Sequence, residues 1–342
     1  MKRLLLALPL LALFAQSSPA ADTLLSSPTI GAADYFGSHL IAAGGDGYLV
    51  VFHAAELEAF FGVRLDASGT PLDARPFLLL ADAPMRFTAS LAWRGDRWAL
   101  VWENRGDLHY AEISSAGEVV ARHSPWVVGL YAPRLAWNGA SLVLAASEAR
   151  GFRYALHTLA VGDGGSVLTD QVVWNSYFLS YDLAAAGSQF GLAIGGSGHT
   201  LVRLAPQGGA LGSTALTPAS VPAGELTIAG LGDGFHVAVV RDSGGEVLHH
   251  VVVNAAGVVT SDREVLRAEG SVSGIRVDLA ASATHVVGVF GGASIDSSAG
   301  GVAAGAWVAD AAGAVLETQP PRPDLDLPAV AATPAHAVAL AV

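Results

Sequence analysis

The sequence predicts an all-β protein, and within that class a β-propeller, from two repeated patterns and the absence of a third. A short apolar strand, a tight turn and a second apolar strand recur along the chain, most clearly at residues 135–146. A second hairpin, whose turn ends in glycine, alternates with the first. No long segment keeps the 3.6-residue period of an amphipathic helix. Two hairpins per unit and a period near 48 residues are typical of a four-stranded propeller blade.

The first pattern provides the two inner strands of each blade. Runs of four to seven apolar residues are bounded by Gly, Asn and Asp, which predicts a β-hairpin for each copy. The small side chains of Ala92, Ala136, Ala184 and Ala280 suit a crowded innermost strand. The seven copies start at Ile41, Leu91, Leu135, Leu183, Ile228, Leu279 and Val330.

The second pattern provides the two outer strands. Its clearest copy is Leu-Asp-Ala-Ser-Gly-Thr-Pro-Leu at residues 65–72. The glycines of successive copies lie 48, 48, 44, 48 and 56 residues apart. A glycine at a fixed place in a hairpin turn predicts positive φ there, which costs glycine little. The six glycines are Gly69, Gly117, Gly165, Gly209, Gly257 and Gly313.

The numbers of hairpins predict how the ring closes. Seven inner and six outer hairpins predict seven blades, six of them full, with a six-bladed ring as the alternative. The last blade would be closed by a strand within residues 22–30, pairing with the blade that begins at Val330. Closure removes free sheet edges that would otherwise favour aggregation. We expect this blade to be incomplete, either because it has three strands or because the chain stops early at Val342.

Residues 1–20 have the features of a secretory signal peptide. Lys2 and Arg3 form a positive start, an apolar run at residues 4–15 is too short to span a bilayer, and small residues precede Ala21. A membrane anchor is the alternative interpretation. We expect residues 21–342 to form one propeller domain, secreted or periplasmic and not inserted in a membrane.

Charge and cysteine content exclude several classes of partner and linkage. The formal net charge of −12 argues against nucleic acid, because phosphate binding needs clustered lysine and arginine. The absence of cysteine leaves an exported chain without disulfides. Ring closure and sheet stacking must therefore supply its stability.

We label the strands of a blade A to D from the inside outward. The D–A and B–C connections share one face, where we expect ligand binding, because binding residues concentrate on loops. Paired carboxylates there could act on a glycoside, and arginines could clamp a carboxylate. The alternative is ordinary loop solubility and local salt bridges. The charged candidates are Glu103, Arg105, Glu148, Arg150 and Arg241.

Six aromatic residues fall outside the regular strand pattern near the same face. A cluster of such rings could stack on sugars or contact an apolar partner. The alternative is packing between neighbouring blades. These residues are Trp126, Tyr131, Trp174, Tyr177, Phe178 and Tyr181, and the first four are the candidates for ligand binding.

Other motifs do not indicate chemistry. Arg94-Gly95-Asp96, the integrin-adhesion tripeptide, falls in a predicted hairpin turn. The Asp-Gly turns lack the alternating oxygen ligands of a calcium loop, and the adjacent His249 and His250 point to opposite faces of a strand. No nucleophile elbow, phosphate loop or dinucleotide fingerprint is present. We therefore expect no metal and no cofactor.

The Leu-Ala-Trp-Asn-Gly turn at residues 135–139 and the Asp-Ala-Ser-Gly-Thr-Pro-Leu turn at residues 66–72 resemble repeat proteins exported by GC-rich bacteria. Those proteins are thought to be β-propellers, and their function is uncharacterised. The resemblance runs from Ile41 to the C-terminus and weakens where Ala185 and Ala281 replace the tryptophan. It implies a fold and an exported location, but no activity. The Trp-Asp ends of WD40 blades and the Asp boxes of sialidases are absent.

These observations predict a non-catalytic binding or scaffold propeller. Its ligand would be a protein or a glycan, held on the D–A and B–C face. The alternative is a carbohydrate-active enzyme, a glycoside hydrolase or lyase, which needs two carboxylates about 5–10 Å apart. The sequence does not indicate an oligomeric state.

Overall fold

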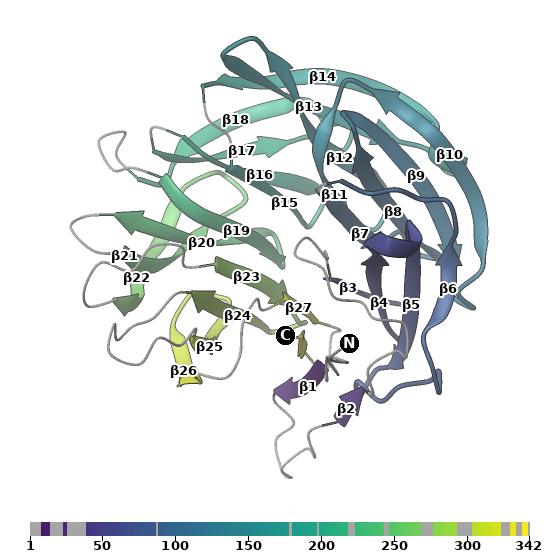
Figure 1. Cartoon of the computed structure of the whole chain (residues 1–342). Coiled ribbons are helices and arrows are strands. Elements are labelled where there is room, and N and C mark those ends of the chain that lie inside the picture. The colour runs from purple at the N-terminus through teal and green to yellow at the C-terminus, as the bar shows by residue number, and fades with distance from the viewer. Residues whose placement is uncertain are drawn as a thin grey trace.

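The computed structural model describes residues 8–13, 23–25, 39–86, 88–177, 180–196, 198–217, 223–242, 246–267, 276–292, 303–322, 329–332 and 337–340. Within these residues the chain is all-β apart from two short 3-10 turns, η1 (Ala55–Leu57) and η2 (Asp163–Gly165). No helix in this part of the chain is long and apolar enough to cross a bilayer. The sheets are arranged radially around a common axis, as in a β-propeller (Figure 1), which confirms the predicted fold.

Six blades each contain four consecutive antiparallel strands. Blades one to three comprise β3 (His39–Gly44), β4 (Gly47–Ala54), β5 (Ala59–Asp66), β6 (Phe77–Leu80); β7 (Ala89–Trp93), β8 (Arg97–Asn104), β9 (Asp107–Ser114), β10 (Val119–Val128); β11 (Tyr131–Trp137), β12 (Leu142–Arg150), β13 (Arg153–Val161) and β14 (Val167–Ser176). Blades four to six comprise β15 (Ser180–Ala186), β16 (Gln189–Gly195), β17 (His199–Leu204), β18 (Ala210–Ala215); β19 (Ala223–Leu231), β20 (Gly234–Asp242), β21 (Glu246–Val253), β22 (Val259–Arg267); β23 (Arg276–Ala281), β24 (His285–Gly292), β25 (Ala303–Asp310) and β26 (Val315–Arg322).

A further four-stranded sheet combines both ends of the chain. Its order is β2 (Thr23–Leu25), β1 (Leu8–Leu13), β28 (Ala337–Leu340) and β27 (Ala329–Ala332). The predicted closing strand is therefore only partly right, because Thr23–Leu25 pairs with β1 and not with β28. The strand beside β28 lies within the predicted signal peptide, and it supplies the strand that the sequence pattern left missing. The predicted cleavage site before Ala21 lies outside the described residues.

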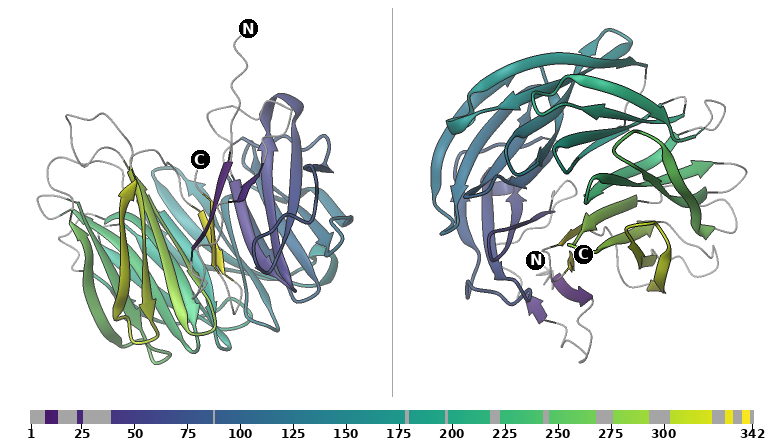
Figure 2. Two further views of the ribbon diagram at one scale, coloured as in Figure 1. Left: turned by 90° about the horizontal axis from the view of Figure 1, so that it is seen from below. Right: turned by 180° about the vertical axis from the view of Figure 1, so that it is seen from behind.

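The ring of innermost strands closes without β1 and β2. Each A strand contacts the A strand of the next blade, and β27 contacts both β23 and β3. Figure 2 shows this arrangement from two further directions. All seven copies of the first sequence pattern form the predicted A–B hairpins.

The predicted turn glycines confirm the C–D hairpins and locate one error. In five of them φ lies between +79° and +87°, as the pattern predicts. In the fourth blade the turn residue is Gly208, with φ of +87°, and not the predicted Gly209. The backbone shows why: the N–H of Gly208 donates to the carbonyl of Ala205, the same three-residue bond that Gly117 makes with Ser114.

Separate apolar clusters between neighbouring blades hold the ring together. Between blades three and four, for example, Val143 packs with Leu183 and Phe190, all of them buried. Burying such side chains contributes roughly 1.5–3 kcal/mol each. Because this packing repeats at successive interfaces, the cysteine-free ring forms a stable frame for the strand ends on each face.

Candidate functional site

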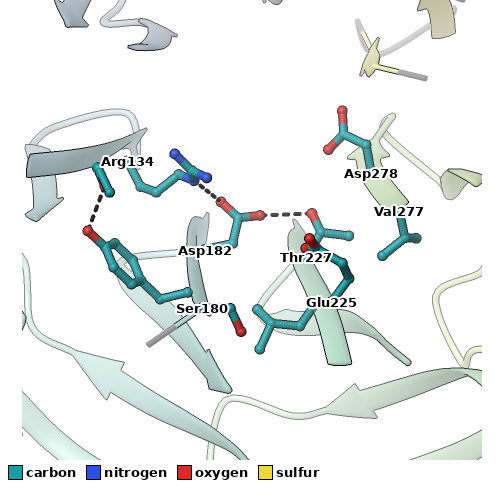
Figure 3. Close-up of a pocket in the computed structure, with 10 residues that line it drawn as sticks. Arg134, Ser180, Asp182, Glu225, Thr227, Val277 and Asp278 are labelled. Atoms are coloured by element: carbon teal, nitrogen blue, oxygen red, sulfur yellow. Dashed lines mark hydrogen bonds and ion pairs between the residues drawn. The ribbon is translucent and has the colours of Figure 1, made fainter. Parts of the chain in front are cut away.

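A pocket of about 320 Å³ opens at the axis, where the A strands of blades three to six begin (Figure 3). The D–A connections lead into these strand ends, so the pocket lies on the face where the sequence predicts binding. Its volume is at the lower end of the range for small-ligand sites. The lining residues are Ala132, Arg134, Ser180, Tyr181, Asp182, Glu225, Leu226, Thr227, Val277 and Asp278.

One repeat position supplies four of the polar groups. Arg134, Asp182, Thr227 and Asp278 each stand directly before the apolar residue that starts a copy of the first sequence pattern. Because A strands from successive blades surround the axis, residues at this position are brought together from points far apart in the chain. The same register that fixes the fold therefore places the polar lining of the pocket.

Asp182 joins blade four to blades three and five. Its Oδ2 accepts the hydroxyl of Thr227 at 2.8 Å and the N–H of Ile228 at 3.1 Å. Its Oδ1 accepts the N–H of Leu183 at 2.9 Å and lies 3.6 Å from Nε of Arg134. Both oxygens are thus occupied by the protein itself.

Asp278 repeats this arrangement one blade pair later. Its Oδ1 accepts the N–H of Leu279 at 2.9 Å, and its Oδ2 accepts the N–H of Val330, in the next sheet, at 2.8 Å. In blade two, Ser90 Oγ accepts the N–H of Leu135 in the same way, at 2.9 Å. Figure 3 shows the Asp278 carboxyl apart from the Arg134–Asp182 pair. Desolvation by the surrounding protein raises the pKa of Asp278 to about 7.

Glu225 differs from the two aspartates. It is exposed, it lines the pocket, and its side chain makes no hydrogen bond or ion pair within the described part of the chain. The surrounding protein still desolvates the carboxyl enough to raise its pKa, and the charge of Arg276 opposes this shift. Glu225 is therefore the carboxyl in the pocket that is available to a ligand.

Tyr181 forms a fixed wall of the pocket. Its buried hydroxyl donates to the carbonyl of Ala132 at 2.6 Å. Burial raises its pKa to about 12, so the hydroxyl keeps its proton and the bond at neutral pH. The Tyr181 hydroxyl is thus committed to the wall.

None of the nine candidate binding residues lines this pocket, although Tyr181, another of the six aromatic residues outside the strand pattern, does. Phe178 lies outside the described residues. Among the charged candidates, Glu103 is buried and accepts the N–H of Gly106, while Arg105 is exposed. Glu148 is held by Arg150 at 2.6 Å and by His157 at 3.1 Å. These are contacts within a turn or within one blade.

Arg241 likewise pairs within its own blade, with Asp262 at 2.9 Å. Roles in ligand binding for the five charged residues stay predictions.

The four predicted aromatic residues are mostly used for packing. Trp126 lies between blades two and three, where its Nε1 donates to the carbonyl of Gly165 at 2.6 Å. Trp174 packs half-buried in the cluster between blades three and four. Tyr131 stacks edge-on against Tyr154, with ring centroids 6.1 Å apart. Only Tyr177 is largely exposed, at 64%, and it covers the guanidinium of Arg153.

The sequence contained a signal for the pocket, but this signal lies in the A strands and not in the loops. The residue before each apolar start is polar in blades two to six, and a propeller directs this position toward the axis. Among the described residues, no group of three or more His, Asp or Glu side chains is arranged to hold a metal ion.

Comparison with known proteins supports the fold. No protein-family model matches the chain, and no curated protein matches it. A prolyl endopeptidase structure is similar, at 15% identity and a TM-score of 0.53, over 91% of this chain and 45% of that one. The chain thus spans less than half the length of that protein. The fucose-specific lectin from Aleuria aurantia is similar at 12% identity and a TM-score of 0.51, over 84% of this chain and 96% of the lectin. At such identities these likenesses show the β-propeller fold alone.

Proposed function

We propose that this chain is a binding propeller, exported by its cell, whose ligand places a small polar group in the axial pocket. The pocket carries this proposal, because it is a preformed concave site where four blades supply polar side chains to one space. A glycan end or a protein end group is the class of ligand that suits it. The signal-like residues 1–20 support export.

The pocket favours binding over hydrolysis. A glycosidase needs two carboxyl groups that are free to exchange protons or attack the sugar. Asp182 and Asp278 each have both oxygens bonded to backbone amides, which leaves Glu225 as the single carboxyl described there that makes no bond to the protein. A carbohydrate-active enzyme remains the alternative function, and release of reducing sugar from a glycan would support it.

The test measures ligand binding through the thermal unfolding of the purified chain. The Tm is recorded in the presence of monosaccharides, amino acids and short peptides. A ligand that binds only the folded state stabilises it by about 2.7 kcal/mol at a hundred times its Kd, which raises Tm. Ser180→Phe fills the pocket and should abolish the rise. Ala116→Phe, in an exposed turn on the opposite face, is the matched control.

Two results would contradict the proposal. One is a Tm rise that Ser180→Phe leaves unchanged, since the ligand would then bind elsewhere. The other is a cooperative unfolding transition that no compound in the three classes shifts.

A further inference from the structure

The polar groups around the axial pocket leave carboxylate acceptors free, while two of its hydroxyl donors are occupied by the protein. The Thr227 hydroxyl donates to Asp182, and the Tyr181 hydroxyl donates to the Ala132 carbonyl. Arg134 donates from Nη1 to the carbonyl of Pro133 at 2.9 Å and faces Asp182 through Nε. The hydroxyl donors of Thr227 and Tyr181 are therefore already used by the protein, while Arg134 keeps further N–H groups beside Asp182.

The carboxylates of Glu225 and Asp278 have acceptor sites that the protein leaves unused. A carboxylate offers about four lone-pair sites. Asp278 uses one site on each oxygen for a backbone amide, and Glu225 uses none within the described part of the chain. A ligand that satisfies this wall must bring several donors of its own.

The charge balance points the same way. Three carboxyl groups line the pocket against one guanidinium, which lies beside Asp182, and the charge of Arg276 also acts on Glu225 from outside the lining. Desolvation by the surrounding protein raises the pKa values of Glu225 and Asp278, and the charge of Asp182 adds to both shifts. An incoming cation would favour ionisation of both groups.

We infer that the ligand group held in the axial pocket is an ammonium carried by a hexose-sized amino sugar. This inference rests on the proposed function and specifies its ligand. An ammonium brings three N–H donors and one positive charge, which match the unused acceptors of Glu225 and Asp278. The volume of about 320 Å³ suits one ring more than a long chain, and Ser180 and Thr227 supply hydroxyl oxygens for the ring hydroxyls.

The inference has a consequence for pH. Asp278 is largely protonated below about pH 7, and an ammonium binds its ionised form better. Affinity for the amino sugar should therefore rise from pH 6 to pH 7.5, while affinity for a neutral sugar stays flat.

The experiment is isothermal titration of the purified chain with 6-amino-6-deoxyglucose and with glucose. The two sugars differ only by an ammonium in place of a hydroxyl, and this alkyl ammonium stays charged from pH 6 to 7.5. We expect the amino sugar to bind about tenfold more tightly at pH 7.5, in line with a hydrogen bond to a charged group. Glu225→Gln should remove most of this difference, while Glu118→Gln, an exposed carboxyl on the opposite face, should not.

The possible outcomes separate this inference from the proposed function. Equal affinity for both sugars would overturn the inference that the pocket holds an ammonium, but would leave the proposal of a sugar-binding pocket. Binding of triglycine, but not of its N-acetylated form or of the amino sugar, would assign the ammonium to a protein terminus and overturn the amino sugar. Failure of every compound in this titration and in the thermal screen would overturn both proposals.

Discussion

Charged groups are paired differently in two regions of the molecule. These are the interface between blades two and three and the pocket lined by blades three to six. In the first, buried Arg94 pairs with Glu112 at 2.6 Å and also with Asp163 of blade three. Arg97 supplies a second cation to Glu112 at 3.0 Å. In the pocket, neither Glu225 nor Asp278 forms an ion pair within the described residues, and only the more distant positive charges of Arg276 and Arg134 act on them. Carboxylates paired with arginine hold blades together, whereas the poorly paired ones surround an open space.

The paired interface also explains the role of Arg94 in the Arg94-Gly95-Asp96 tripeptide. The side chain of Arg94 is only 8% exposed, because it turns into the interface toward Glu112. An adhesion receptor would need that guanidinium at the surface. The tripeptide is therefore a turn whose arginine has a structural role, as the hairpin pattern predicts.

The largest effect we expect comes from breaking the paired interface. Arg94→Met removes the main cation beside Glu112, whose carboxylate is only 1% exposed. Leaving a buried charge without its partner typically costs about 3–5 kcal/mol. Urea unfolding at pH 7 measures this loss, with exposed Arg75→Met as the control. A loss below about 1 kcal/mol would show that Arg97 alone suffices.

Acid should destabilise the other side of the ring. His236 and His250 are buried in blade five with Nδ1 and Nε2 3.0 Å apart, and burial lowers their pKa values to about 4 and about 3. Below pH 6.5 the unfolded chain binds protons that the folded chain does not, so stability falls as pH falls toward 4. At pH 5 the loss is about 2 kcal/mol per histidine.

Asp278 acts in the opposite sense over part of this range. Its folded pKa of about 7 lies above its unfolded value, so its own contribution to stability increases on acidification from pH 7. Urea unfolding at pH 7, 6 and 5 should therefore show a net loss of about 2 kcal/mol in the parent, and a steeper loss in Asp278→Asn. A flat profile in Asp278→Asn would mean that the histidine pair is solvated.

A smaller effect separates the two kinds of carboxyl within the pocket. Asp182→Ala leaves the buried N–H of Ile228 without its acceptor, which typically costs about 1–3 kcal/mol. Glu225→Gln should change stability by less than about 0.5 kcal/mol, because it removes no contact described here. Equal losses in urea unfolding would contradict the division into structural and ligand-binding carboxyls.

The sequence was sufficient for the fold because blade formation is local. An A–B hairpin depends on a dozen neighbouring residues, and a C–D turn depends on one glycine with positive φ. The error at Gly209 was a choice between adjacent glycines, which the chain alone does not distinguish. The strand beside β28 was missed because Leu8–Leu13 has the composition of a signal peptide, which the pattern cannot tell from a strand.

The site was harder to predict because it depends on contacts between blades. Glu148 and Trp174 were chosen as loop-end residues, yet His157 pairs with Glu148 within its blade, and Trp174 packs against the apolar cluster between blades three and four. Asp182 was overlooked because it adjoins the apolar motif and looks like part of a strand. Its role becomes visible only when blade five is placed beside blade four.

The recurring bond from Ser90, Asp182 and Asp278 to the next blade gives the ring a second, longer period. These residues are 92 and 96 residues apart, so the bond joins blades two and three, four and five, and six and the last sheet. The modular unit of this chain for protein engineering is thus a pair of blades. Deleting residues of blades four and five together would place Asp278 after Arg134, where Asp182 now stands, and keep the remaining joints intact. Deleting one blade of a joined pair would leave an amide or a carboxyl facing the wrong neighbour, so ring size can be redesigned in steps of two.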